Sequence, residues 1–386
     1  MPDTLHALDS EADDIVERTR AFVEEVCIPE EPSQRARNHW PTDDLRLDLV
    51  GKARDAGIYG PHLPVELGGL GLPWVDRAKI FQAVGYSMLG PMALHCSAPD
   101  EGNHHLLHMV ASGAQKEQFL VPLVQDAKRS CFMMSEPDGA GADPTQMTAT
   151  AVRDGNDYLV SGRKWYITGA IGAEVAIIMA RDGDAEDARP TMFLTPMSAP
   201  GIEIVRDMDG IAHESPGGHC EVNLDNVRVP AENVLGAPGE AFRYAQVRLA
   251  PARLTHCMRW LGGAERSHDV ARRYGVSRKA FGKPLVAHQA VGSMLADNEI
   301  DIRTSELMIA DCARLLDAGE HARHETSLAK VFVSEAVWRT VDRCVQILGG
   351  IGVMADTPVE AIFRAARAFR IYDGPSETHR DAIARR

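Results

Sequence analysis

The feature that most constrains the fold is a double change in hydrophobic period. In the last third of the chain, apolar residues recur at helical spacing, as Val331, Trp338 and Val345 do. Between residues 131 and 234 the apolar runs are short, alternating or β-branched, and turn residues such as DGND at 154–157 separate them. The preceding residues again have a helical pattern, whose last stretch, Ala114 to Leu120, is expected to stop before Pro122. The sequence therefore predicts an α+β protein with a helical domain, a β-domain and a helical bundle at residues 1–130, 131–238 and 239–386.

The composition excludes several classes of protein. The net charge is −14 with histidine neutral, whereas proteins that bind nucleic acid or anionic membranes need a cationic surface. The seven cysteines form no CxxC pair, which argues against a disulfide scaffold or zinc finger and favours a reducing compartment. Because the N-terminus has no apolar signal region and no apolar run approaches about 18 residues, we expect a soluble, cytoplasmic protein without a membrane span.

Three segments could contact phosphate groups. Residues 348–355, LGGIGVMA, imitate a dinucleotide fingerprint, but they follow a helical stripe and Pro358 disfavours the required helix. A helix C-terminus followed by a loop is the better interpretation. The basic segment 271–283 is either a solvated helix end or a site for a diphosphate cofactor. The glycine-rich segment 135–143, SEPDGAGAD, allows a ligand close to the backbone, although a strand connection would look similar.

Two further sites have both a structural and a functional interpretation. His104 and His108 lie four residues apart and could share a metal, but neither an HExxH frame nor a third ligand accompanies them. We therefore expect a core or pocket lining and no metal site. Asp373 directly precedes Gly374 and Pro375. An aspartate in that setting usually forms a cap or turn, so nothing in the local sequence identifies it as catalytic.

Six segments, taken in order, resemble motifs of the acyl-CoA dehydrogenase family. They are SEPDGAGAD (135–143), GRKWYITGA (162–170), DNVRVPAENVLG (225–236), SRKAFGKPLVAHQ (277–289), VQILGGIGV (345–353) and IYDGPSE (371–377). The resemblance covers nearly the whole chain, from about Thr19 to Arg386. It implies the family fold of an N-terminal helical domain, a central β-barrel or sandwich and a C-terminal helical bundle.

The resemblance also implies FAD, held at a subunit interface in a homodimer or homotetramer. Thr168 matches the threonine that reaches flavin N5, and Tyr166 takes the place of a tryptophan that covers the flavin. Arg278, Phe281 and Gln289 would contact FAD from the neighbouring subunit. The other positions that the resemblance assigns to FAD binding are Phe132, Met134, Ser135, Gly141, Gln346, Gly349, Gly350 and Glu377.

The resemblance places the catalytic base at Asp373, where most of the family has glutamate. Another base position, immediately before Arg253, is Ala252 and cannot serve. The implied reaction is removal of the α-proton of an acyl-CoA by Asp373 while the β-hydride moves to flavin N5, which gives the trans-2-enoyl-CoA. Arg253 and Gly374 are assigned to the substrate, and the Asp373 N–H would polarise the thioester oxygen. Because the bound acyl chain would exclude water, the pKa of Asp373 is expected to rise.

Several departures from the common motifs indicate one branch of the family. Ala280 and Pro375 replace hydroxyl residues, and the segment 96–103, CSAPDEGN, accompanies the aspartate base. The branch includes modules fused to phosphotransferase-like kinase domains and associated with hydroxylated acyl-CoAs. The resemblance also implies an electron-transfer flavoprotein as the electron acceptor. The alternatives on the same fold are a nitroalkane oxidase, which also uses aspartate, an acyl-CoA oxidase and a non-catalytic flavin or acyl-CoA binding protein.

Overall fold

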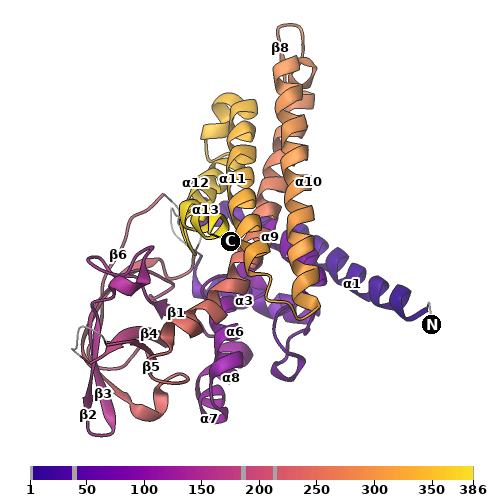
Figure 1. Cartoon of the computed structure of the whole chain (residues 1–386). Coiled ribbons are helices and arrows are strands. Elements are labelled where there is room, and N and C mark those ends of the chain that lie inside the picture. Colours follow the sequence, from indigo (N-terminus) through magenta and orange to yellow (C-terminus); the bar gives the residue numbers. More distant parts are fainter. Residues whose placement is uncertain (1–2, 37–40, 184–187, 212–214, 386) are drawn as a thin grey trace.

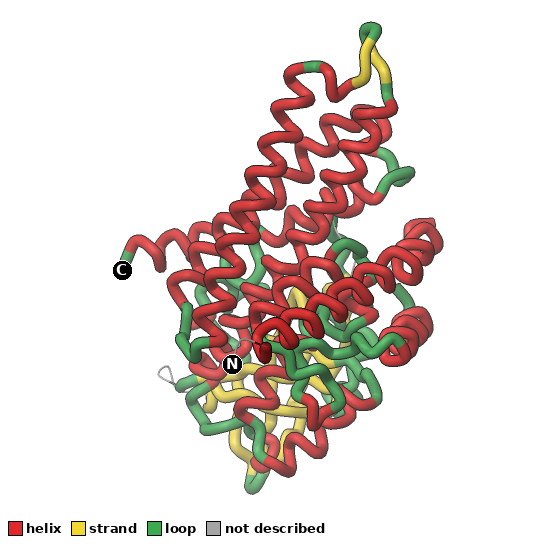
Figure 2. The backbone as a smooth tube through the Cα atoms, turned by 90° about the vertical axis from the view of Figure 1, so that its right-hand side faces the viewer, coloured by secondary structure: helices red, strands yellow, loops and turns green. Residues whose placement is uncertain are grey.

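The computed structural model describes residues 3–36, 41–183, 188–211 and 215–385. Helices of the N-terminal part and a curved sheet occupy one end, and long helices extend away from them (Figure 1). Most strands gather at this end, and one short hairpin lies at the far tip of the helices (Figure 2). This layout confirms the predicted order of helical, β and helical parts. Within the described residues, no helix has the length and hydropathy of a membrane span.

The N-terminal part is helical, as the period predicts. Its described helices are α1 (Asp3–Phe22), α2 (Ile28–Ala36), α3 (Asp43–Asp55), α4 (Trp74–Gly85), α5 (Gly90–Ala93), α6 (Asp100–Val110), α7 (Gly113–Gln115) and α8 (Val121–Gln125). Two π-helical turns, Val23–Cys27 and Lys116–Leu120, join α1 to α2 and α7 to α8. The sequence interpretation that the helix stops before Pro122 is wrong. Pro122 lies in the first turn of α8, where a missing N–H is tolerated.

The central part is one curved sheet. Its strands are β1 (Ser130–Met133), β2 (Thr150–Asp154), β3 (Asp157–Thr168), β4 (Val175–Asp182), β5 (Pro190–Pro196), β6 (Ile202–Asp207) and β7 (His219–Pro230). The strand order is β1-β4-β2-β3-β7-β6, and β5 pairs with β4. Register shifts between β3 and β7 bend the sheet, because an extra residue increases the local twist. One shift lies at Gly162, where a Cβ atom would approach Ala149 Cβ to 2.5 Å.

The C-terminal part is a bundle built around a 37-residue helix. It contains α9 (Ala241–Ser277), the hairpin β8 (Lys279–Ala280) and β9 (Lys283–Pro284), α10 (Gln289–Asp317), α11 (Arg323–Leu348), α12 (Pro358–Phe369) and α13 (Ser376–Ala384). The glycine-rich segment follows the end of α11: Gly349 has a φ of +63°, and a 3₁₀ turn spans Gly349–Val353. The sequence interpretation of this segment as a helix end and loop is confirmed.

A glycine pair brings α4 and α9 into backbone contact. A Cβ atom on Gly85 would lie 1.8 Å from the carbonyl oxygen of Arg259, and one on Gly262 would lie 2.0 Å from that of Gln82. Either distance is far below van der Waals contact, so larger residues would force the helices apart. This crossing fixes the middle of α9, which carries much of the candidate site described below.

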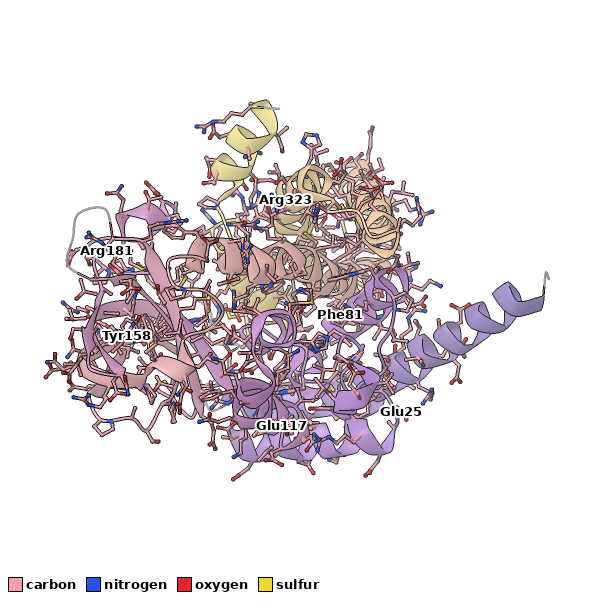
Figure 3. All side chains as sticks on the ribbon, turned by 60° about the horizontal axis from the view of Figure 1, so that its bottom comes forward. Glu25, Phe81, Glu117, Tyr158, Arg181 and Arg323 are labelled. Carbon is pink, nitrogen blue, oxygen red and sulfur yellow. The ribbon has the colours of Figure 1, made fainter. Side chains whose placement is uncertain are left out.

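Three buried apolar clusters hold the parts together. The largest joins α1 and α4 to the C-terminal helices, with Phe81 fully buried at its centre (Figure 3). A second joins α6 and α8 to the sheet, and the third lies within the sheet around Tyr158 (Figure 3). All seven cysteines are free, as their spacing predicts, and the structure shows that they are also buried.

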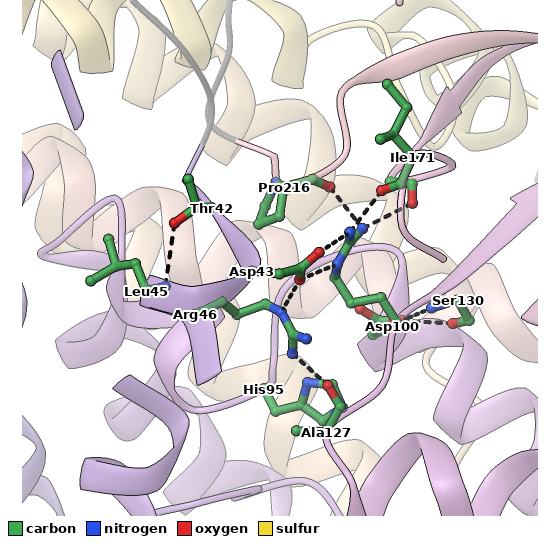
Figure 4. Close-up of polar contacts among 12 residues, drawn as sticks. Thr42, Asp43, Leu45, Arg46, His95, Asp100, Ala127, Ser130, Ile171 and Pro216 are labelled. Carbon is green, nitrogen blue, oxygen red and sulfur yellow. Dashed lines mark hydrogen bonds and ion pairs between the residues drawn. The ribbon is translucent and has the colours of Figure 1, made fainter. Parts of the chain in front are cut away.

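A buried arginine joins the N-terminal helices to the sheet. Arg129 donates to both carboxylate oxygens of Asp43 at 2.9 and 2.7 Å (Figure 4). It also donates to the carbonyls of Gly169, Ile171 and Pro216 at 2.7–3.2 Å. Because guanidinium offers five donors in a rigid fork, one side chain can fix all these groups. The loop directly after Thr168 is thereby held against α3.

Candidate active site

A cavity of about 440 Å³ lies where the three parts of the chain meet. Helix α6 and the segment before it contribute Ala98, Glu101 and Gly102 to its wall. The ends of β3 and β7 and the C-terminal part complete it, mainly with Tyr166, Thr168, His219, Arg248, Ala252, His256, Arg259, Tyr372 and Asp373. The sequence-predicted residues Tyr166, Thr168 and Asp373 therefore face one cavity.

Asp373 is held in an unusual backbone conformation. Its φ is +54°, in the left-handed region that non-glycine residues seldom adopt. Its carbonyl oxygen accepts hydrogen bonds from Arg253 Nε at 2.9 Å and from His379 Nε2 at 3.3 Å. Among the described residues, its own N–H donates to no protein acceptor. These contacts fix the backbone and leave that N–H available to a ligand.

The carboxylate of Asp373 has a specific partner in α9. Asp373 Oδ2 lies 3.1 Å from His256 Nε2, and both side chains are mostly buried. Burial alone would raise the pKa of Asp373, but the hydrogen bond from His256 and the nearby charges of Arg248 and Arg253 outweigh it. The net effect lowers the pKa of Asp373 below the usual range of aspartate. The predicted rise in this pKa concerns the site with an acyl chain bound and stays a prediction.

Thr168 and Tyr166 lie at the end of β3. Thr168 Oγ1 is 3.0 Å from His219 Nδ1 across the β3–β7 pair. Tyr166 has a φ of +54° at the second register shift of this pair, and the residue is 56% exposed. An extra residue in a strand redirects a side chain. Here it turns a large aromatic ring outward at the rim of the cavity.

Two hydrogen bonds attach the segment after β1 to β3. Lys164 donates to Glu136 Oε1 at 2.7 Å, and Trp165 N donates to the Ser135 carbonyl at 3.1 Å. Phe132 lies under the guanidinium of Arg248, 4.3 Å from its ring centroid. The predicted cofactor residues Phe132, Met134, Ser135 and Gly141 thus lie on β1 and its following loop, outside the wall of the cavity.

A second group of predicted residues lies far from the cavity. Arg278, Phe281 and Gln289 are exposed at the β8–β9 hairpin, at the tip of the bundle in Figure 1. The end of α11 reaches the same region, because Gly275 lies beside Ile347. Exposed residues there are Gln346, Gly349 and Gly350, whereas Glu377 is exposed on α13, four residues after Asp373. A single chain therefore does not bring the two groups together.

The two residues assigned to substrate lie behind Asp373. Arg253 donates to the Asp373 carbonyl, and Gly374 packs against the His379 ring, which a Cβ atom would approach to 2.8 Å. Neither belongs to the cavity wall. In the structure both contact the backbone that carries the candidate base.

Sequence reasoning missed Arg248, His256 and Arg259, which line the cavity from α9. With Ala252 they are spaced by four, four and three residues, which places them on one helical face. Arg248 Nε donates to Asn103 Oδ1 at 2.7 Å. The spacing is visible in the sequence. Nothing in the sequence, however, shows that these three polar side chains of a mostly buried helix face one cavity.

The histidine pair of α6 lines a separate cavity of about 450 Å³. His104 is buried there beside His62, and the nitrogens of both rings have no hydrogen-bond partner among the described residues. The prediction that His104 and His108 line a core or pocket is confirmed. Over the described chain, no group of three or more His, Cys, Asp or Glu side chains is placed to hold a metal ion.

Comparison with known proteins shows which family has this architecture. The acyl-CoA dehydrogenase N-terminal, middle and C-terminal domain profiles match residues 9–127, 131–227 and 239–386. The chain belongs to the acyl-CoA dehydrogenase family. It is therefore a member of a family of flavoprotein oxidoreductases, and the resemblance of its six motifs is confirmed.

Relatives of this acyl-CoA dehydrogenase family member differ in length. The Mycobacterium tuberculosis protein named "Probable acyl-CoA dehydrogenase FadE2" is 37% identical over 88% of this chain and 84% of that protein. Acyl-CoA dehydrogenase family member 11 of Gallus gallus is 35% identical over 90% of this chain, but over only 45% of that protein. Butyryl-CoA dehydrogenase from Megasphaera elsdenii has the same fold, with a TM-score of 0.87, 26% identity and 97% of both chains covered.

Proposed function

We propose that this chain binds FAD and catalyses the α,β-dehydrogenation of an acyl-CoA thioester to the trans-2-enoyl-CoA, with Asp373 as the base. The observation that supports this most directly is that Asp373, Tyr166 and Thr168 line one cavity. Ala252 lines the same cavity and offers no proton acceptor. Glu101, another carboxylate in the wall, accepts a hydrogen bond from Thr255 at 2.9 Å and faces Arg259.

Two features of the chain fit FAD. The outward ring of Tyr166 and the hydroxyl of Thr168 offer a flat surface and a hydrogen-bonding group beside the cavity. At the bundle tip, Phe281 is 96% exposed in a turn with a φ of +51°, close to the basic residue Arg278. An aromatic ring and a guanidinium suit an adenosine and a diphosphate. When bound, FAD supplies a two-electron acceptor for the β-hydrogen of the substrate.

The chain's own residues account for proton removal and for stabilisation of the developing charge. Asp373 removes the α-proton, and its carboxylate is ionised in advance because its pKa is low. The Asp373 N–H is placed to donate to the thioester oxygen, where negative charge develops as the proton leaves. The buried guanidinium of Arg248 beside the cavity favours an acyl chain with a polar substituent over a plain alkyl chain.

The separation of the two groups of FAD residues supports a homodimer or homotetramer, in which the hairpin of one subunit contacts the FAD bound in the cavity of another.

Phe281→Ala is expected to weaken FAD binding about tenfold, because it removes an apolar contact that the isolated chain leaves open. FAD retention in equilibrium dialysis measures this. Met109→Ala, at another exposed apolar residue, is the matched control. Equal FAD affinity in the two variants would contradict the assignment.

The test of the reaction is anaerobic mixing of the FAD-loaded protein with a panel of acyl-CoAs. Bleaching of the oxidised-flavin absorbance by at least one of them is expected. Bleaching by a nitroalkane but by no acyl-CoA would indicate a nitroalkane oxidase and overturn the proposal. Rapid peroxide formation in air would indicate an acyl-CoA oxidase, whereas slow reoxidation supports our further proposal that an electron-transfer flavoprotein takes the electrons.

The pH dependence follows from the low pKa of Asp373. We expect kcat/KM to stay constant from pH 8 down to about pH 5, because the ionised base persists below the usual aspartate value near 3.9. Protonation would remove the base, so the rate falls only as the pH drops through this lowered pKa. Steady-state assays across this range measure it. An acid limb centred above pH 5 would show that the carboxylate is not held ionised.

A further inference from the structure

His256 contacts the candidate base directly from α9. It lies in α9, and its ring centroid is 4.8 Å from that of Tyr372. Its Nε2 is 3.1 Å from Asp373 Oδ2. Nothing in the motif pattern of the sequence assigns a role to this residue. The contact joins a buried imidazole directly to the carboxylate proposed to take the α-proton.

Arg259 determines which ring nitrogen carries the proton. Its NH2 group lies 3.2 Å from His256 Nδ1, while its NH1 group donates to the Cys96 carbonyl at 2.8 Å. Because guanidinium has donors and no acceptor, Nδ1 must accept and therefore carries no proton. The neutral ring then has its single N–H on Nε2. Burial lowers the pKa of His256, which favours this neutral form.

This tautomer fixes the direction of the hydrogen bond between His256 and Asp373. Nε2–H donates to Asp373 Oδ2, so this oxygen is occupied and Oδ1 is left to accept the substrate proton. As the α-carbon–hydrogen bond breaks, a new O–H bond forms at Oδ1, and His256 keeps its own proton. The two-electron acceptor of the proposed reaction takes the β-hydrogen with its electron pair.

Aspartate needs such a constraint more than glutamate in this setting. Its side chain is one methylene shorter, so its reach depends on the backbone and on the rotation of the carboxylate about χ2. Arg253 and His379 hold the carbonyl of Asp373, and His256 holds one carboxylate oxygen. Small errors in placing a reacting group lower rates strongly, which makes this second restraint valuable.

We propose that His256 is a positioning residue for the dehydrogenation: it fixes the Asp373 carboxylate through Oδ2 and keeps it ionised, while Arg259 fixes the tautomer that makes this possible. The proposal rests on the proposed function, in which Asp373 is the base. The other charged or titratable groups that face the pair are Arg248, Arg253 and Arg259 of α9, Glu101 of α6, Lys330 of α11 and His379 of α13.

The experiment compares two substitutions at His256 in the FAD-loaded protein. His256→Leu removes the donor, whereas His256→Gln keeps an N–H near the position of Nε2. Loss of a hydrogen bond to a charged group should shift the acid limb of kcat/KM upward by about one to two pH units from its wild-type position. We expect His256→Gln to restore the flat wild-type profile. His321→Leu, at an exposed histidine, is the matched control and should not move it.

A profile for His256→Leu that coincides with wild type would overturn the proposal, as would an equal shift in His256→Gln. Difference infrared spectroscopy against Asp373→Asn adds a readout that does not need turnover. Protonation of the Asp373 carboxyl at a higher pH in His256→Leu than in wild type supports the contact. If Asp373→Asn retains turnover, the proposed function fails while the infrared result still decides the His256 contact, so the two failures are distinguishable.

Discussion

Asp373→Asn is expected to leave FAD bound and to lower the rate of flavin reduction by an acyl-CoA about 10²- to 10⁴-fold. Asparagine has nearly the same shape and can still accept the hydrogen bond from His256, but it cannot take a proton. Arg253 and His379 bind the backbone carbonyl of residue 373, so both contacts survive the change. The loss therefore reports the base rather than a collapsed site.

Stopped-flow flavin reduction under anaerobic conditions measures this effect, with FAD content determined on the same samples. Asp356→Asn is the matched control, because Asp356 is exposed in the same C-terminal part. Reduction by Asp373→Asn at close to the wild-type rate would show that another group removes the α-proton. Glu101 would then be the next residue to test, since its carboxylate lines the same cavity.

The architecture was predictable because hydrophobic period reports directly on burial. The predicted stripe lies on α11, where Val331, Trp338 and Val345 are partly buried beside the fully buried Val337 and Val341. The segment around residues 154–157 became the β2–β3 hairpin. Local exceptions depended on context. Pro122 was expected to stop a helix, but the π-helical turn before it places the proline at the start of α8. The local sequence does not show where a π-helical turn shifts the register of a helix.

The candidate site was predictable only through the family resemblance. Asp373 looks like an ordinary turn residue in its local sequence, and its partner Arg253 lies 120 residues away. The role of His256 depends on two contacts, to Asp373 and Arg259, and on the tautomer that they select. The low pKa of Asp373 in the chain itself could not be predicted for the same reason, because it depends on neighbours that outweigh its burial.

The second large effect concerns the attachment of the loop after β1. Lys164→Met is expected to lower the melting temperature by about 5–10 °C, because it leaves the buried carboxylate of Glu136 without its cation. The exposed fractions of the Lys164 and Glu136 side chains are 0% and 1%. Glu136 also accepts from the N–H and hydroxyl groups of Thr148 at 2.6 Å, so its charge cannot turn toward water without breaking these bonds.

Thermal unfolding of the variants distinguishes this buried pair from an ordinary ion pair. Lys128→Met is the matched control, since Lys128 and Glu174 are 38% and 56% exposed and such pairs contribute only about 0–1 kcal/mol. Lys164→Met with Glu136→Gln should recover part of the loss, because the unpaired charge is gone. A Lys164→Met variant with the same melting temperature as Lys128→Met would contradict this prediction. Because Glu136 and Lys164 belong to different motifs, the pair connects the loop at 135–143 to the strand that carries Tyr166 and Thr168, and FAD affinity should fall together with stability.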